Sequence, residues 1–252
     1  MTGNRDFINK NVIVTGAGRG LGKAIAIEFA RRGSSVALFG KTEENLVAVS
    51  ETINQFGGKS FVITGDVRAT DHVNRCVDET LKRLGGIDIL INCAGIFRSS
   101  PSDAVTLEDW NEIIDTNLTG TYLFCKVAGQ EMLKKGDGKI VNFCSLLSHT
   151  AFPERMAYAS SKGGVLQLTK VLGIEWIKKG INVNAISPGM IQVAGPHPTI
   201  SQESLINRIP AGRIGKPSDI VGPVMFLASE DANYIAGQTI VVDGGWLSYG
   251  FL

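Results

Sequence analysis

NVIVTGAGRGLG, residues 11–22, is the stretch that decides the fold. Its first five residues form a short apolar and β-branched run typical of a buried strand, and a helical pattern begins at Leu21. Four glycines punctuate the junction: Gly16, Gly18, Gly20 and Gly22. Such glycines let the backbone bend tightly and approach a phosphate, and the N-terminus of the helix offers free N–H groups. The stretch predicts a strand, a phosphate-binding turn and a helix.

The alternation of strand and helix continues along the chain. Further short apolar runs lie at 35–39, 60–64, 87–92, 139–143, 182–186 and 239–242. Helical periodicity covers 21–32, 43–56, 70–84, 107–135, 156–179 and 217–228. Runs that are apolar throughout are typical of strands covered on both faces, and strands joined through helices lie parallel. We therefore expect an α/β fold: a doubly wound parallel sheet of about seven strands, with helices on both faces, in a single domain over residues 1–252.

Composition and charge exclude several classes of protein. With 44% hydrophobic and 19% charged residues, the chain is of ordinary globular type. A formal net charge of +1 gives no electrostatic reason to bind nucleic acid or a membrane surface. The N-terminus lacks an apolar signal segment, and no apolar run approaches the roughly 18 residues of a membrane span. The four cysteines lack metal-site spacing, so we expect a cytoplasmic protein without a bound metal.

Ligands of doubly wound sheets bind beyond the carboxyl ends of the strands, so functional residues should follow each predicted strand. Residues 187–209 interrupt the alternation and open with SPGMIQVAGPHPTIS. A loop of that length inside a compact domain is typical of a lid or binding loop, with a surface excursion as the alternative. We expect a substrate loop there.

Several motifs appear where this rule places them. Asp66-Val67 follows the third predicted strand, Asn92-Cys93-Ala94-Gly95 the fourth, Ser145 the fifth and Pro188-Gly189 the sixth. Asn117 lies within a helical segment, and Tyr158-Ala-Ser-Ser-Lys162 lies near the start of another. In this order, over residues 8–246, the motifs resemble the short-chain dehydrogenase/reductase family. The chain departs from the family's NNAG motif at Cys93, which replaces the second Asn.

The resemblance implies a Rossmann-type domain and an NAD(P)-dependent oxidoreductase that interconverts a carbonyl and a secondary alcohol by hydride transfer. It also implies the site residues. The catalytic set would be Asn117, Ser145, Tyr158 and Lys162. The cofactor would be bound by Gly16, Arg19, Gly20, Leu21, Gly22, Lys41, Asp66, Val67, Asn92, Ala94, Gly95, Tyr158, Lys162, Pro188, Gly189 and Ile191.

Hydride transfer to a carbonyl develops negative charge on oxygen, so an acid must supply a proton. Tyr158 would be that acid, with Lys162 one helical turn away lowering its pKa. Ser145 would orient the substrate oxygen, with its neighbour Ser148 a weaker candidate, and Asn117 would hold a water that links Lys162 to solvent. Tyr122 and Lys126 repeat the spacing, but they lie in mid-helix without a serine thirteen residues upstream. We therefore assign them no catalytic role.

The end of the second predicted strand indicates which cofactor binds. NAD enzymes normally carry an acid there for the ribose 2′-hydroxyl, whereas this chain has Gly40 followed by Lys41. With Arg19 in the glycine turn, two cations and no carboxylate favour a 2′-phosphate. NADP(H) is therefore preferred, with NAD(H) as the alternative.

The substrate is defined less sharply. Val193 stands where the family often has a Thr that contacts the nicotinamide amide; His197 follows in the loop, and His149 and Phe152 are candidate pocket residues. A small carbonyl or alcohol is the first expectation. A 3-oxoacyl-carrier-protein reductase is the alternative, with Lys134, Lys135 and Lys179 as candidate docking cations beside their reading as solvated lysines. From another class, a non-catalytic dinucleotide-binding protein stays open, although the intact catalytic set argues against it.

The resemblance also implies a homotetramer assembled through the long helices that carry Asn117 and Tyr158 and through the last strand. The apolar tail at 244–252 fits burial at a subunit interface or against the core of its own subunit.

Overall fold

The computed structural model describes residues 6–193, 203 and 206–249. Seven parallel strands form one sheet in the order β3-β2-β1-β4-β5-β6-β7. Their bounds are β1 Asn11–Thr15, β2 Ser35–Gly40, β3 Lys59–Thr64, β4 Ile89–Asn92, β5 Gly138–Phe143, β6 Ile181–Pro188 and β7 Thr239–Val242. The order reverses between β1 and β4, which is where sheets of this type bind ligands. The predicted doubly wound sheet is confirmed.

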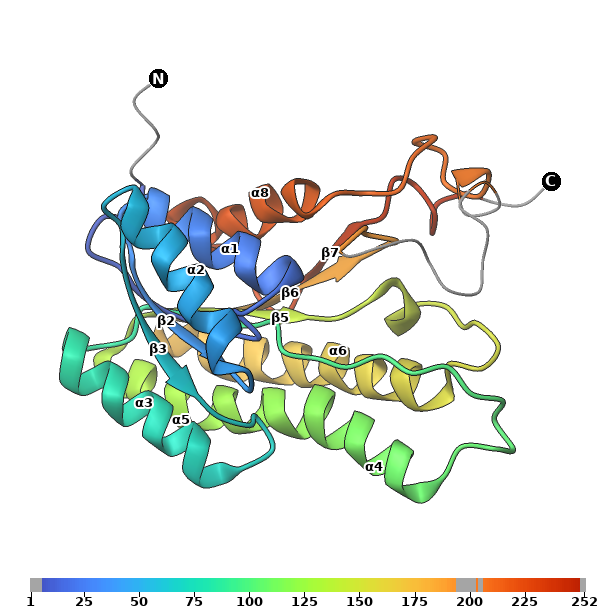
Figure 1. Cartoon of the computed structure of the whole chain (residues 1–252), viewed down its shortest axis with the longest axis horizontal. Coiled ribbons are helices and arrows are strands. Elements are labelled where there is room, and N and C mark those ends of the chain that lie inside the picture. The colour runs from blue at the N-terminus through green and yellow to red at the C-terminus, as the bar shows by residue number, and fades with distance from the viewer. Residues whose placement is uncertain (1–5, 194–202, 204–205, 250–252) are drawn as a thin grey trace.

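Helices cover both faces of the sheet (Figure 1). One layer contains α1 Gly20–Arg31, α2 Glu43–Gln55 and α8 Pro217–Ala228. The other contains α3 Thr70–Leu84, α4 Leu107–Ile114, α5 Gly120–Lys135 and α6 Met156–Trp176. Val12 and Val14 of β1 pack into the first layer, and Ile13 between them packs into the second. This two-sided burial explains why the strands are apolar throughout.

One predicted helix is in fact two. Residues 107–135 form α4 and α5, joined by a π-helical turn, η1, at Asp115–Thr119. The hydrophobic period of a helix does not reveal one locally widened turn, so the sequence pattern missed it. Such turns are frequent at functional sites, and this one contains Asn117.

Other differences are small. The predicted helix at 156–179 ends at Trp176 and continues as a 3₁₀ turn, η3, at Ile177–Lys179. Two further 3₁₀ turns lie at Leu146–Ser148 (η2) and Glu230–Ala232 (η4). None of the helices that the structure describes is long and apolar enough to cross a membrane.

Candidate active site

The glycine turn between β1 and α1 requires its glycines. Gly16 and Gly20 adopt φ values of 68° and 55°, a region that residues with a Cβ rarely occupy. A Cβ on Gly22 would lie 2.2 Å from the carbonyl oxygen of Gly16, and one on Gly16 would lie 2.8 Å from Ala94 Cα. Because these glycines lack side chains, the start of α1 packs directly on the turn, and the turn packs directly on the backbone after β4. Arg19 precedes α1 and is exposed, and Leu21 packs against the core.

Thr15, which sequence analysis did not single out, fixes the neighbouring motif. Its Oγ1 accepts hydrogen bonds from the backbone N–H groups of Cys93 and Ala94, both at 3.1 Å. These bonds join the end of β1 to the residues after β4. The departure at Cys93 leaves this join intact because the bonds use its backbone.

The Asn92 side chain points into the molecule. Its Nδ2 donates to Asn142 Oδ1 at 2.9 Å and to Cys125 Sγ at 3.3 Å. Asn142 Nδ2 donates in turn to Thr169 Oγ1 at 3.0 Å. Asn92 therefore braces β4 against β5 and α5, and Asn142 extends the network to α6. Because the Asn92 side chain points inward, only its backbone borders the site.

Asn117 is fully buried and held by two elements. Its Oδ1 accepts from Ile96 N at 2.8 Å, while Nδ2 donates to Ile96 O and to Ser161 Oγ, both at 3.0 Å. Both N–H groups of the amide are therefore used. For the predicted bridging water, the side chain retains only acceptor capacity on Oδ1.

Gly95 provides space beside that oxygen. A Cβ at Gly95 would lie 3.2 Å from Asn117 Oδ1 and 3.6 Å from Lys162 Nζ. Both atoms therefore lie near the side of Gly95 from which a side chain would project. Because glycine leaves that side uncovered, a water molecule packed against Gly95 there would be within reach of the amide oxygen and the ammonium.

Ser145, Tyr158 and Lys162 come together at the ends of β5 and α6. Lys162 Nζ donates to Phe143 O at 2.6 Å and lies 5.9 Å from the centre of the Tyr158 ring. Ser145 Oγ accepts from Leu147 N at 3.2 Å. The structure thus assembles the four predicted catalytic residues from η1, β5 and α6.

The electrostatics of this group differ from the sequence-based expectation. Burial raises the pKa of Tyr158, and a hydrogen bond with Ser145 only partly opposes the rise. Burial also lowers the pKa of Lys162. The expected lowering of the Tyr158 pKa by Lys162 is therefore wrong for this structure, in which desolvation of the phenol dominates.

Beyond β2 and β3, a charged cluster borders the site. Asp66 accepts from Arg68 Nε at 2.9 Å and Nη2 at 2.7 Å, and Lys41 Nζ lies 3.2 Å from its Oδ2. Burial alone would raise the pKa of Asp66, but hydrogen bonds from Arg68 and Lys41 lower it to about 2. Sequence analysis missed Arg68, although an arginine two residues after an acid is a visible signal. Val67 is buried beside Gly120.

The turn after β6 is also set by close packing. A Cβ on Gly189 would lie 2.6 Å from Asp243 Cα, and Ile191 bridges to Gly215. The side chain of Val193 lies 3.5 Å from where a Cβ on Gly20 would be. Pro188 ends β6, so this segment runs from the sheet to the glycine turn. Residues 194–202, with His197, lie outside the described part of the predicted substrate loop.

Aromatic residues line the side of Tyr158. The Phe97 ring packs edge-to-face on the Tyr158 ring at 5.1 Å, and the guanidinium of Arg155 lies 5.0 Å from the Phe97 centre. Glu154, next to Arg155, adopts a left-handed φ of 62°, and strained residues of this kind cluster at functional sites. Phe97 and Arg155 were not found from the sequence.

The residues predicted to line the pocket have defined partners. Phe152 packs against Trp246 with ring centres 5.7 Å apart, so the described part of the C-terminal tail covers its own subunit. His149 is exposed, and its Nε2 lies 3.0 Å from Ser187 Oγ. Burial and the charge of Lys170 lower the His149 pKa.

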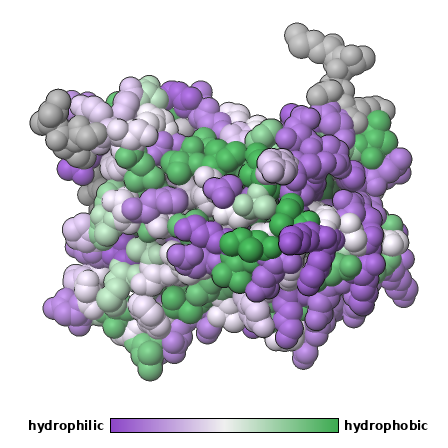
Figure 2. All heavy atoms as spheres, turned by 180° about the vertical axis from the view of Figure 1, so that it is seen from behind, coloured by the Kyte–Doolittle hydropathy of each residue, from purple (hydrophilic) through white to green (hydrophobic). Residues whose placement is uncertain are grey.

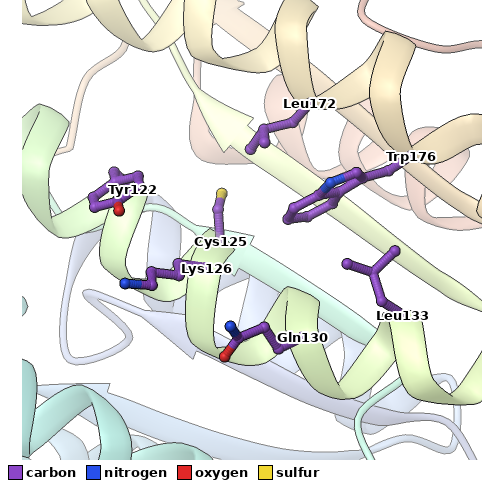
Figure 3. Close-up of a pocket in the computed structure, with 7 residues that line it drawn as sticks. All are labelled: Tyr122, Cys125, Lys126, Gln130, Leu133, Leu172 and Trp176. Atoms are coloured by element: carbon purple, nitrogen blue, oxygen red, sulfur yellow. The ribbon is translucent and has the colours of Figure 1, made fainter.

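Tyr122 and Lys126 lie elsewhere, as expected. They line a hollow of about 250 Å³ between α5 and α6, with Cys125, Gln130, Leu133, Leu172 and Trp176 (Figure 3). A Cβ on Gly129 would lie 2.5 Å from the Trp176 ring, so this glycine lets the indole reach α5. The Tyr122–Lys126 pair therefore lies on an outer helix surface, away from the other candidate catalytic residues.

The candidate docking cations are distant from the site, and two of the three are paired. Lys135 forms ion pairs with Asp88 and Asp137, and Lys134 pairs with Glu131. Asp88 directly precedes β4 and Lys179 lies two residues before β6, so both are at the amino edge of the sheet. The site lies at the carboxyl edge, so these lysines give no support to carrier-protein docking there.

Comparisons with known proteins agree with the geometry. A family model described as enoyl-(acyl carrier protein) reductase matches residues 16–247. Glucose 1-dehydrogenase of Gluconobacter oxydans (strain 621H) is 38% identical over 250 residues, which are 97% of this chain and 94% of the relative. A 3-oxoacyl-(acyl-carrier-protein) reductase of Staphylococcus aureus (strain Mu50) is 37% identical over 242 residues, 94% of this chain and 98% of the relative. The crystal structure of a gluconate 5-dehydrogenase from Burkholderia cenocepacia J2315, in complex with NADP and tartrate, has a TM-score of 0.92 at 33% identity and covers 98% of each chain.

Proposed function

The chain belongs to the short-chain dehydrogenase/reductase family and is an NAD(P)-dependent oxidoreductase of alcohols and carbonyls, and we propose that Tyr158 is its general acid and base. The observation that carries the proposal is the assembly of Tyr158, Lys162, Ser145 and Asn117 from three separate elements at the carboxyl edge of the sheet. A spacing alone does not produce that arrangement, as Tyr122 and Lys126 demonstrate.

The β1–α1 turn fits a dinucleotide. Close packing at Gly16 and Gly22 holds the tight turn that ends at the N-terminus of α1, and the free N–H groups there suit a pyrophosphate. The other proposed cofactor residues follow β2, β3, β4 and β6 along the same edge. A bound nicotinamide supplies or accepts the hydride.

In the reduction direction, Tyr158 Oη donates a proton to the carbonyl oxygen as it gains charge. Its raised pKa keeps the phenol protonated near neutral pH and so suits this role. Ser145 Oγ donates a hydrogen bond that orients the same oxygen. A water held by Asn117 Oδ1 beside Gly95 then passes a proton to Lys162, which relays it towards Tyr158. Oxidation uses these steps in reverse, with the phenolate as base.

For the cofactor, we propose NADP(H). Gly40 ends β2 without a carboxylate, and Lys41 is an exposed cation directly after it. A 2′-phosphate would compete with Asp66 for Lys41, whereas NAD(H) offers no such anion. The Burkholderia relative was crystallised with NADP, which supports this choice.

For the substrate, we propose a secondary alcohol or ketone on a sugar or polyol skeleton. The relatives named for glucose and gluconate support this class, and the half-exposed Phe97 ring beside Tyr158 offers a flat apolar face of the kind that sugar C–H groups contact. A 3-oxoacyl-carrier-protein reductase is the second candidate, favoured by the 37% identity of the staphylococcal enzyme.

We further propose that the chain works as one cofactor-binding domain, with a substrate loop at 187–209, and as a cytoplasmic homotetramer. Exposed apolar side chains support the assembly: Tyr122 on α5, Val171 and Ile174 on α6 and Val241 on β7. Hydrophobic side chains also form patches between hydrophilic ones on the face in Figure 2.

The test is Tyr158→Phe, which keeps the ring and its packing on Phe97 but removes the acid. We expect turnover to fall by at least about 100-fold while NADPH affinity stays within about twofold, because general acid–base catalysis contributes roughly 10²–10⁴-fold. Oxidation of NADPH and NADH is followed with ketones, keto sugars and acyl thioesters. Tyr122→Phe is the matched control and should keep wild-type activity. Near wild-type turnover by Tyr158→Phe would refute the assignment.

A further inference from the structure

Two serine hydroxyls, of buried Ser161 and half-buried Ser148, each connect two of the four proposed catalytic residues. Ser161 Oγ accepts a hydrogen bond from Asn117 Nδ2 at 3.0 Å and donates to Tyr158 O at 2.7 Å. Ser148 Oγ accepts from Ser145 N at 3.2 Å and donates to Lys162 O at 2.9 Å. Each hydroxyl thus accepts a hydrogen bond from a residue outside α6 and donates one to a backbone carbonyl of α6.

The single proton of each hydroxyl is already engaged, so neither serine has a donor left for substrate. This excludes Ser148 from the substrate-orienting role for which it was the weaker sequence candidate. The bonds reach backbone atoms of Tyr158 and Lys162, and therefore act on the position of α6 as a whole. They join it at two points to η1 and to the β5 end.

We propose that Ser148 and Ser161 are positioning residues that hold Tyr158 and Lys162 in register with Ser145 and Asn117. The proposal rests on the proposed function of Tyr158. Without the Ser161 bond, one buried N–H of Asn117 Nδ2 has no partner, which favours rotation of the amide. That rotation would break the two hydrogen bonds to Ile96 and move Asn117 Oδ1 away from Gly95. Without the Ser148 bond, Ser145 moves independently of Lys162. A misplacement of about 1 Å in either place costs up to about 100-fold in rate.

The chain offers a matched control one residue away. Ser160 precedes Ser161 on α6 but is exposed to solvent. Ser160→Ala and Ser161→Ala make the same chemical change in the same helix, and alanine favours helix at both positions. Ser160→Thr and Ser161→Thr form a second matched pair in which the hydroxyl is kept.

We expect Ser161→Ala and Ser148→Ala to lower kcat by about 10- to 100-fold, with the substrate KM and the NADPH Kd within about twofold. Ser160→Ala should match wild type, and Ser161→Thr should recover most of the rate. In a double-mutant cycle, Ser161→Ala added to Asn117→Ala should cost little more than Asn117→Ala alone. Wild-type kcat in both alanine variants, or full additivity in the cycle, would overturn the proposal.

A second readout needs no turnover. Amide hydrogen exchange in the cofactor-free protein should accelerate at Ile96, whose N–H bonds to Asn117 Oδ1, in Ser161→Ala and not in Ser160→Ala. Equal exchange in the two variants would overturn the role of Ser161 even if no substrate were found. An active Tyr158→Phe, in contrast, would refute the proposed function and leave the exchange result to decide the positioning role.

Discussion

At the scale of single residues, the proposed acid is set by desolvation more than by its cationic neighbour. Lys162 Nζ lies over the face of the Tyr158 ring and donates to Phe143 O. Because the half-buried phenol is partly desolvated by the protein around it, its charged form is disfavoured and its pKa is raised. This arrangement keeps Tyr158 protonated in the cofactor-free protein, although the raised pKa also makes the phenol a weaker acid than an ordinary tyrosine.

We therefore predict that Tyr158 ionises above the ordinary tyrosine pKa of about 10 when no cofactor is bound. Ultraviolet absorbance titration of wild type, compared with Tyr158→Phe, isolates its phenolate. The rates of the two reactions should depend on pH in opposite ways. Reduction needs the protonated phenol, so its rate falls as pH rises through this pKa. Oxidation needs the phenolate, so its rate increases. A Tyr158 transition near neutral pH would restore the sequence-based expectation that Lys162 dominates.

The cofactor preference also depends on one side chain. Lys41→Ala removes the cation proposed for the 2′-phosphate, so kcat/KM with NADPH should fall by about 10-fold or more, while the value with NADH should change by less than about threefold. A hydrogen bond to a charged group contributes about 1.5–3 kcal/mol, and about 1.4 kcal/mol equals tenfold. Lys59→Ala, at an exposed lysine where β3 begins, is the control. A wild-type preference for NADH would contradict the assignment of NADP(H).

At the scale of elements, what the sequence predicted depended on the kind of signal. The strands and most helices followed from periodicity, with ends displaced by at most three residues. The π turn at Asp115–Thr119 was not predictable, since a locally widened turn leaves no hydrophobic period of its own. The contact of Phe97 with Tyr158 was missed because it joins the loop after β4 to α6, which is far away in the chain. The clustering of the candidate site residues was predictable because most of them follow a strand, and parallel strands end at the same edge of the sheet.

The junction of η1 and α5 gives an element-scale prediction. A Cβ on Gly120 would lie 2.7 Å from Val67 Cγ2 and 3.3 Å from Val67 O. Gly120→Ala should therefore separate α5 from the Asp66–Val67 segment, with a loss of stability of about 1–3 kcal/mol and weaker NADPH binding. Thermal unfolding with and without NADPH measures both effects.

The control for this change is Gly222→Ala in α8, where nothing lies within 4 Å of the new Cβ. It should stabilise by about 0.5–1 kcal/mol because alanine restricts the unfolded chain more than glycine does. If the two variants unfolded at the same temperature, the close approach of Gly120 to Val67 would not be a determinant of stability.

At the scale of the whole molecule, the proposed active site lies at one edge of the sheet, and the proposed assembly surface lies on the outer faces of α5 and α6. The amino edge is closed by ion pairs such as Lys135 with Asp88 and by Lys139, whose Nζ donates to Asn182 Oδ1 at 2.8 Å. The outer faces of α5 and α6 instead present apolar side chains around the hollow in Figure 3. Sequence periodicity did not distinguish that surface from a core-facing one.

Assembly through this surface is the last prediction. Ile174 is 73% exposed on α6, and a monomer gains nothing from an isoleucine in water. The wild type should therefore be a homotetramer by light scattering, and Ile174→Lys should shift it towards smaller species, because a lysine charge buried at an interface core is strongly unfavourable. Val47→Lys, on the exposed side of α2, makes a similar change away from α5 and α6 and should leave the tetramer intact. A monomeric wild type would remove the assembly proposal, whereas a tetramer that persists in Ile174→Lys would move the interface to another face, with Val241 of β7 as the next residue to substitute.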